Sequence, residues 1–287
     1  MPEGDTIFRA ARTLDRALAG KVVTSFETQL PQLARVDYDT PLVGRTIDKV
    51  DAAGKWMRIW FSGDLILLSH MLMSGSWHIY RIGERWQRPR IQMRAAIYTS
   101  DFVAVGFQVP VAEFHTAATL ERHRSVQKLG PDVLAPEFDQ AAAIAQLRSR
   151  PDLEVGEALL RQSLVAGIGN VFKSEVCFAS QVNPFRLVGE LSISEFASLM
   201  SNARKFLMSN VTDTAGDGIV TYTGLRRTTG RADPSERLWV YKRGGEPCRR
   251  CGTAILSRKQ GLDARITFWC PQCQPPALQT MQTPQAS

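Results

Sequence analysis

The stretch LVAGIGNVF, residues 164–172, joins two segments whose apolar residues recur at helical spacing. Gly167 and Gly169 permit a tight turn whose successive backbone N–H groups point outward. Asn170 is well placed to cap the second helix and to donate its amide to an anion. A turn of this kind at a helix N-terminus can bind a phosphate, but a glycine-rich turn between helices is also a common geometric feature. On these residues alone both interpretations stay open.

The helical pattern extends on both sides of this turn. A polar connector over 121–135 contains Leu129-Gly130-Pro131, which is typical of a domain boundary. A Gly- and Thr-rich stretch over 212–230 suits either a plain mobile loop or a segment that closes over a bound base. Between them, apolar spacing predicts helices over 141–147, 155–163, 171–179 and 194–208.

The residues before the connector are predicted to form one helix followed by strands. Apolar spacing gives an amphipathic helix over 5–19, with Asp5 or Thr6 as its cap and Gly20 at its end. From about 21 to 114 the pattern changes to short β-rich segments separated by turn residues, which predicts antiparallel sheets. The clearest expected strands are 55–61, 65–72, 77–82, 91–98 and 102–108.

The cysteines give the strongest purely chemical signal. Two CxxC pairs, separated by eighteen residues, have the spacing of a tetrahedral Zn²⁺ site with four thiolate ligands, Cys248, Cys251, Cys270 and Cys273. No ligand position is left open, so we expect one structural zinc rather than a catalytic one. The residues between the pairs are enough for a β-hairpin that carries Arg258 to Arg265. The fifth cysteine, Cys177, lies on an apolar helix and is expected to be a buried thiol.

The net charge is concentrated near the zinc finger. The segment 226–265 holds eleven basic and four acidic residues, which accounts for the whole net charge of +7. Such a basic segment is the electrostatic footprint of a protein that binds a polyanion. A zinc hairpin with arginines beside Phe268-Trp269 therefore fits contact with nucleic acid, although a zinc ribbon that binds protein remains an alternative.

Composition limits the class of protein. The length of 287 residues suggests about two domains, and 44% hydrophobic with 22% charged residues excludes a disordered chain, a collagen and a coiled coil. The longest apolar stretch, 65–73, is too short to span a bilayer, and the acidic start is not a signal peptide. We therefore expect a cytoplasmic protein that makes no membrane contact, in a compartment where cysteines bind metal or stay reduced.

The second residue has chemical potential of its own. Met1 before Pro2 is a context in which the initiator methionine is normally removed, which leaves a secondary amine at the start of a helix. The helix dipole favours the neutral amine, which can form a Schiff base, and Glu3 could move the protons. Most prolines at this position have no such role, so the residues alone do not decide.

Four elements occur together and in order: Pro2-Glu3-Gly4-Asp5, Gly54-Lys55, the 164–172 stretch and the four-cysteine finger. In this combination the chain resembles bacterial members of the formamidopyrimidine-DNA glycosylase / endonuclease VIII family, from Pro2 to about Cys273. The resemblance implies an N-terminal helix with a two-sheet antiparallel β-sandwich, a helical domain with a helix–two-turn–helix motif, and DNA in the cleft between domains. The expected boundaries are 1–120 for the sandwich, 121–135 for a linker, 136–230 for the helical domain, 238–274 for the finger and 275–287 for a disordered tail.

The resemblance also implies a bifunctional DNA glycosylase and abasic-site lyase of base excision repair, acting on a base flipped out of the DNA stack. Pro2 would be the nucleophile at C1′ of the damaged nucleoside, and Glu3 would protonate the sugar and shuttle protons. Lys55 would contact phosphate and assist β,δ-elimination. Asn170 and Arg265 would grip the phosphates that flank the lesion, and Arg265 also counts among the catalytic residues. Gly167 and Gly169 would complete this DNA-binding set.

Two features bear on the substrate. Met73 resembles the apolar wedge that fills the hole left by the flipped base, although a core methionine on a strand is an equal alternative. The purine-specific branch carries Arg-Arg-Phe where this chain reads Val105-Gly106-Phe107-Gln108-Val109-Pro110, and its start also differs. Both departures indicate the endonuclease VIII branch and oxidised pyrimidines. The missing arginine further suggests that single-stranded or bubble DNA is cut as well as duplex.

Three alternatives remain: a purine-specific glycosylase, a zinc-ribbon protein that binds DNA without chemistry, and a zinc-dependent hydrolase. Four histidines with no HExxH sequence argue against the hydrolase. We expect a monomer, associated with the nucleoid through DNA binding.

Overall fold

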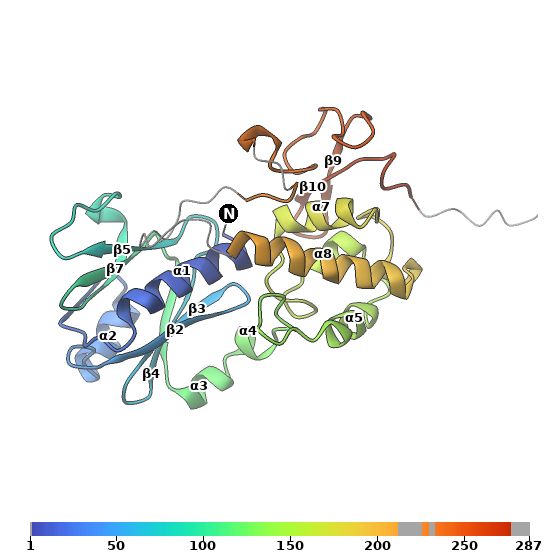
Figure 1. Cartoon of the computed structure of the whole chain (residues 1–287). Coiled ribbons are helices and arrows are strands. Elements are labelled where there is room, and N and C mark those ends of the chain that lie inside the picture. Colours follow the sequence, from blue (N-terminus) through green and yellow to red (C-terminus); the bar gives the residue numbers. More distant parts are fainter. Residues whose placement is uncertain (1, 212–225, 230–232, 277–287) are drawn as a thin grey trace, which may run out of the picture. The chain divides into compact units, whose positions relative to one another are not determined.

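The computed structural model describes residues 2–211, 226–229 and 233–276. Most of the 212–230 stretch and nearly all of the expected tail lie outside the described residues. The chain forms two compact units, and Figure 1 labels the helices and strands of both. Unit 1 comprises Met1–Asp139, Gln162–Ile168 and Leu207–Arg226, and unit 2 comprises Gln140–Arg161, Gly169–Phe206 and Arg227–Ser287.

Unit 1 contains two four-stranded antiparallel sheets, as the strand-rich sequence predicts. One sheet has the order β1-β6-β7-β5 and the other the order β2-β3-β4-β8. All five expected strands are present. The strands are β1 Ser25–Thr28, β2 Ile47–Ala53, β3 Trp56–Phe61, β4 Leu65–His70, β5 Ser76–Arg81, β6 Met93–Tyr98, β7 Phe102–Phe107 and β8 Val111–His115.

Helix α1, Gly4–Leu18, contacts strands of both sheets and helps to fill the core between them (Figure 1). Its buried face includes Ile7, Leu14 and Leu18, which belong to one apolar cluster with residues of each sheet. The helix confirms the amphipathic pattern, but the expected cap is wrong. The N-cap is Glu3, without a side-chain cap bond, and Asp5 lies inside the first turn.

The region predicted to consist of short strands and turns also contains a helix, α2, Pro31–Asp39. Pro31 stands at its first turn, a position that suits proline, and Leu33 is its buried residue. A helix with so small a buried face shows little periodicity, which explains why the sequence pattern missed it. A further short helix, α3 Ala117–Glu121, precedes the polar connector, which itself begins with the short helix α4 Arg124–Gln127.

Unit 2 holds the helices expected from the sequence and a β-hairpin. The hairpin packs against α7 and pairs antiparallel from Arg265↔Gln260 to Trp269↔Leu256. The last turn of α8 belongs to unit 1. The helices are α5 Gln140–Arg148, α6 Val155–Leu160, α7 Asn170–Ala179 and α8 Ile193–Val211, and the strands are β9 Leu256–Gln260 and β10 Arg265–Trp269. Short 3₁₀ turns lie at η1 Arg90–Gln92 in unit 1 and at η2 Val188–Glu190 and η3 Pro234–Glu236 in unit 2.

Within the described residues, every helix is too short or too polar to cross a membrane.

Candidate functional site

The start of the chain is seated on the glycine turn of the 164–172 stretch. The backbone N–H of Gly4 donates to the carbonyl oxygen of Gly167 at 2.9 Å. A Cβ at Gly4 would lie 2.7 Å from that oxygen and 2.8 Å from the Cα of Gly167. Pro2 is half-buried, whereas Glu3 is 0% exposed. Since a charged or polar group is buried only when it is compensated, Glu3 belongs to a structured polar site rather than to a frayed terminus.

Lys55 is held near the same turn through the residue before it. Gly54 has a φ of +57°, in the left-handed region that favours glycine, and its N–H donates to Asp132 Oδ2 at 2.6 Å. A Cβ at Gly54 would lie 3.3 Å from the Cβ of Ala166. Gly54 therefore packs on Ala166, as Gly4 packs on Gly167. Gly4 and Gly54 therefore place the segments that carry Glu3 and Lys55 against the same dipeptide of unit 1, Ala166-Gly167.

Asp132 holds the Ala166-Gly167 dipeptide in position, a role that sequence reasoning did not identify. Its other carboxylate oxygen accepts the N–H of Leu134 at 2.9 Å. The backbones of Asp132 and Ala166 also form a parallel bridge, with the Ala166 N–H donating to the Pro131 carbonyl at 3.0 Å. The only signal for it in the sequence was its place directly after Gly130-Pro131.

His70, at the end of β4, is a neighbour of the Lys55 charge. Burial first, and then the positive charge of Lys55, lower the pKa of this imidazole below its ordinary value. His70 Nδ1 accepts the N–H of Leu72 at 3.0 Å. His70 therefore lies near the Lys55 charge and contacts the loop that carries Met73.

The glycine turn differs in detail from the expected anion cradle. Gly167 has a φ of +96°, but its N–H donates to Gln162 Oε1 at 3.1 Å and therefore does not point outward. Asn170 does not cap α7: the N-cap is Gly169, without a side-chain cap bond, and Asn170 is the first helical residue. Gln162 also donates to the carbonyl of Ile168 at 3.0 Å, so its side chain spans the turn.

Asn170 points instead to the finger hairpin of unit 2. Its Nδ2 donates to the carbonyl of Ile266, the residue after Arg265, at 2.9 Å. Arg265 opens strand β10 and is half-buried. Buried Lys173, one turn further along α7, donates to Thr267 Oγ1 at 2.6 Å. The side chain of Asn170 therefore contacts the residue next to Arg265, within one unit.

A second buried carboxylate, Glu175, ties α7 to the segment that leads into the finger. It is 0% exposed and accepts the backbone N–H groups of Trp239, Val240 and Tyr241 at 2.8, 2.9 and 2.8 Å. The hydroxyl of Thr228 donates to it as well. Burial raises the pKa of Glu175, and these hydrogen bonds oppose the rise. No sequence pattern indicated this anchor.

Arg226 also contacts the start of the chain. Sequence reasoning grouped this residue only with the basic segment. Its guanidinium donates to Asp5 Oδ2 through Nε at 2.9 Å and to Asp5 Oδ1 through Nη2 at 2.9 Å. Nη2 also donates to Thr6 Oγ1 at 2.8 Å. The Asp5 carboxylate is 0% exposed, so this ion pair replaces the cap that the sequence suggested.

Met73 lies in the turn between β4 and β5 and is 60% exposed, which excludes the core methionine considered above. Its neighbour Leu72, which the sequence analysis did not single out, is 47% exposed with a φ of +45°. Two adjacent exposed apolar side chains on a turn have the form of a wedge. In contrast, Val105, Gly106 and Phe107 are buried within β7.

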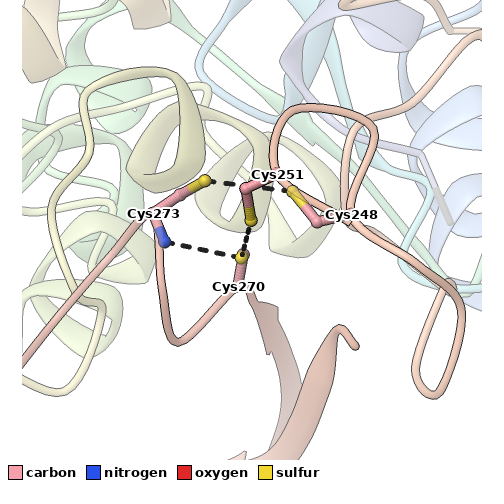
Figure 2. A group of neighbouring side chains, drawn as sticks. All are labelled: Cys248, Cys251, Cys270 and Cys273. Carbon is pink, nitrogen blue, oxygen red and sulfur yellow. Dashed lines mark hydrogen bonds between the residues drawn. The ribbon is translucent and has the colours of Figure 1, made fainter. Parts of the chain in front are cut away.

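The four finger cysteines converge as the CxxC spacing predicts (Figure 2). The Sγ atoms of Cys251 and Cys270 are 3.5 Å apart and those of Cys248 and Cys273 are 3.9 Å apart. Tetrahedral Zn²⁺ with Zn–S bonds of about 2.3 Å requires sulfur separations of roughly 3.8 Å, so the residues fit the metal. Four thiolates leave no position for substrate, and zinc here would supply folding energy. Cys177 is buried, and burial raises the pKa of its thiol to about 12.

Fold and site together define a zinc-finger protein with a two-sheet unit, and comparison with known proteins gives its family. The sequence matches the formamidopyrimidine-DNA glycosylase N-terminal domain over residues 1–110, the formamidopyrimidine-DNA glycosylase H2TH domain over 129–222 and the zinc finger found in FPG and IleRS over 245–276. The chain belongs to the formamidopyrimidine-DNA glycosylase / endonuclease VIII family.

Relatives of similar length support this assignment. The chain is 42% identical to "Probable endonuclease 8 2" of Streptomyces coelicolor over 96% of this chain and 94% of that one. It is 36% identical to "DNA-(apurinic or apyrimidinic site) lyase Nei2" of Mycolicibacterium smegmatis, over 96% and 99%. The fold resembles Lactococcus lactis Fpg in complex with abasic-site DNA, with a TM-score of 0.79 at 23% identity over 95% of this chain and 99% of that one.

Proposed function

We propose that this DNA glycosylase and abasic-site lyase of base excision repair excises oxidised pyrimidines through a Schiff base on Pro2. The activity class is that of its endonuclease 8 and lyase relatives. The observation that carries the proposed site is the packing of Gly4 and Gly54 on the dipeptide Ala166-Gly167. It supports a single reaction centre in unit 1 for Pro2, Glu3 and Lys55.

The chemistry uses the amine that removal of Met1 creates. The Pro2 nitrogen forms a bond to C1′, the bond from C1′ to the base breaks, and the electron pair leaves with the base, which takes up a proton. Buried Glu3 protonates the sugar oxygen as the ring opens to the iminium. Removal of a 2′ proton then expels the 3′ phosphate by β-elimination, and δ-elimination expels the 5′ phosphate. Lys55 holds a phosphate and assists these steps.

The DNA backbone is gripped by residues of unit 2. Asn170 and Arg265 bind the phosphates beside the lesion, and Arg265 is suited to this because a guanidinium can hold a phosphate through two parallel hydrogen bonds. The contact from Asn170 to Ile266 supports a joint role for the helix start and the hairpin. Gly169 and the N-terminus of α7 complete the site. Gly167 acts through its carbonyl, which receives the N–H of Gly4.

Met73, with Leu72, fills the space left by the flipped base. Their exposure on the turn after β4 supports this wedge. The segment Val105-Gly106-Phe107-Gln108-Val109-Pro110 contains no arginine of its own, which supports a pyrimidine preference and cutting of single-stranded or bubble DNA. The protein acts as a monomer in the cytoplasm on chromosomal DNA. Catalysis is the role of residues 1–120, DNA binding is the role of 136–230, and zinc binding is the role of 238–274.

A panel of lesions tests the proposed specificity. Single-turnover rates are measured on matched oligonucleotides with thymine glycol, dihydrouracil or 8-oxoguanine, each as duplex, bubble and single strand. We expect both pyrimidine lesions to be cut at least tenfold faster than 8-oxoguanine, with single-strand rates close to duplex rates. Faster cutting of 8-oxoguanine would assign the chain to purine repair instead. Salt-sensitive DNA binding without cleavage of any lesion would leave a DNA-binding zinc protein.

A further inference from the structure

Three side chains of unit 1, far from the finger cysteines in sequence, direct metal-binding atoms at one point. Glu113 and His115 are two apart on β8 and therefore lie on the same side of the strand. His123 is the N-cap residue of α4. Nε2 of His115 is 3.3 Å and Nε2 of His123 is 3.8 Å from Glu113 Oε2. One ligand atom from each residue lies within 4.8 Å of the others.

His115 has an oxygen partner on each side of its ring. Its Nδ1 is 3.4 Å from Thr119 Oγ1. The Thr119 hydroxyl donates to the carbonyl of Thr116 at 3.1 Å, and its oxygen accepts the N–H of Thr116 at 2.8 Å, which leaves a lone pair that can accept a proton from Nδ1. In the tautomer that carries its proton on Nδ1, Nε2 presents its lone pair to Glu113. Metal-binding histidines are oriented in this way, with the second nitrogen donating to a neighbouring acceptor.

His123 has an unsatisfied buried nitrogen. Its Nδ1 has no hydrogen-bond partner within the described residues and is shielded from solvent. The ring is held edge-on between Trp56 and His115, with centroid distances of 5.2 and 5.3 Å. A proton on Nδ1 leaves the Nε2 lone pair facing the carboxylate, and a proton on Nε2 leaves Nδ1 as a buried acceptor. A cation between Nε2 and the carboxylate removes the repulsion that the first arrangement creates, while the Nδ1 proton stays without an acceptor among the described residues.

The geometry fits a transition metal. Metal–nitrogen and metal–oxygen bonds of about 2.0–2.1 Å in a tetrahedral site separate the ligand atoms by roughly 3.3 Å. The His115–Glu113 separation of 3.3 Å matches this value, and the His123–Glu113 separation of 3.8 Å requires a small inward shift of the His123 ring. Two imidazoles and one carboxylate are a ligand set that Zn²⁺ accepts with a water in the fourth position. Glu113 is 46% exposed, which gives an ion and that water access from solvent.

We propose that Glu113, His115 and His123 bind a second divalent transition metal ion, of the Zn²⁺ class, separate from the zinc of the finger. The ion would join β8 to the start of α4 and so brace the connector between the sandwich and the helical region. Because His123 packs on Trp56, the residue after Lys55, the brace would also fix the start of β3 next to the lysine. This proposal is independent of the reaction that the chain catalyses.

Metal stoichiometry of the full-length protein tests the proposal. Protein that retains its finger zinc is dialysed against a weak chelator and titrated with Co²⁺, and bound metals are counted by mass spectrometry. We expect one zinc and one cobalt per chain, with weak visible bands that lack thiolate-to-cobalt charge transfer. His115→Gln and His123→Gln should each abolish cobalt binding, whereas Glu121→Gln, an exposed acid on α3, should retain it.

Two further results complete the test. Zn²⁺ should raise the Tm of the unmodified protein and of Glu121→Gln but not of the histidine variants, which checks that those variants fold in its absence. Zinc alone per chain, cobalt that survives both substitutions, or cobalt with thiolate charge transfer would overturn the proposal. The first of these results would leave Glu113 and the histidines as an ordinary surface ion-pair cluster.

Discussion

The backbone N–H of Gly4 donates to the carbonyl of Gly167 across 2.9 Å, and no side chain separates the two residues. This contact places the residue after Glu3 directly on the turn before α7. It explains why glycine is needed at both positions, since Gly167 has a φ of +96° and Gly4 has no room for a Cβ. The proposed nucleophile is thus positioned by a turn remote in sequence.

Replacing Gly4 by alanine should disrupt this contact. The new Cβ would lie 2.7 Å from the Gly167 oxygen, and a backbone atom cannot move aside as a flexible side chain does. We expect a destabilisation of about 1–3 kcal/mol and a loss of lyase activity of at least tenfold. Urea unfolding and abasic-site cleavage rates measure the two effects. Arg16→Ala, exposed on the same helix, is the control and should change neither by much.

Breaking the ion pair between Asp5 and Arg226 should be strongly destabilising. Asp5→Ala leaves a guanidinium that is 15% exposed without its buried carboxylate, and breaking a buried pair costs about 3–5 kcal/mol. Chemical denaturation gives the loss. The comparison is Asp101→Ala, which removes the exposed partner of Lys21 and should leave stability nearly unchanged. Equal losses in the two variants would show that the Asp5 pair is no more than a surface contact.

Glu175 should control the attachment of the finger to α7. In Glu175→Gln one carbonyl oxygen must replace two carboxylate oxygens, and the new NH₂ group faces N–H donors of residues 239–241. We expect a loss of about 1–3 kcal/mol and faster removal of zinc by a chelator. Glu190→Gln, half-exposed in the same unit, serves as control. Zinc release at the unmodified rate would contradict the anchoring role.

His78 should make the sandwich acid-sensitive. Burial, and then the charge of Arg88, lower the pKa of His78 from 6.5 to about 4, so the unfolded chain binds its proton more readily. Stability from this group is therefore full above pH 6.5 and is lost as the pH falls towards 4, by at most about 1.4 kcal/mol per pH unit. His78→Gln should flatten the dependence of the unfolding free energy on pH over that interval. If His78→Gln left the slope of unfolding free energy against pH unchanged, that result would contradict the role of His78.

The features that could be predicted are those that depend on residues near one another in sequence. The CxxC pairs, the amphipathic face of α1 and the alternating strands each depend on local spacing, and the structure contains all of them. Apart from the missed helix α2, the errors concern contacts over long sequence separations. Asp5 resembles a helix cap, but it pairs with a residue 221 positions away.

The same limit applies to the polar residues of the site. Lys173 and Glu175 look like the solvent face of a helix, yet both are buried because their partners come from residues 228–267. Asn170 resembles a cap, but Ile266 takes its amide, and Gln162 takes the N–H that was expected to point outward from Gly167. Only the tertiary fold supplies these partners.

Borohydride trapping tests the central claim, a Schiff base on Pro2, most directly. Purified protein is mixed with DNA that carries one abasic or thymine-glycol site, reduced with borohydride, and digested for peptide mass mapping. We expect a covalent adduct on the N-terminal peptide that is absent in Pro2→Gly and weak in Glu3→Gln. An adduct mapped to Lys55 or elsewhere, or an undiminished adduct in Pro2→Gly, would contradict the assignment of the nucleophile.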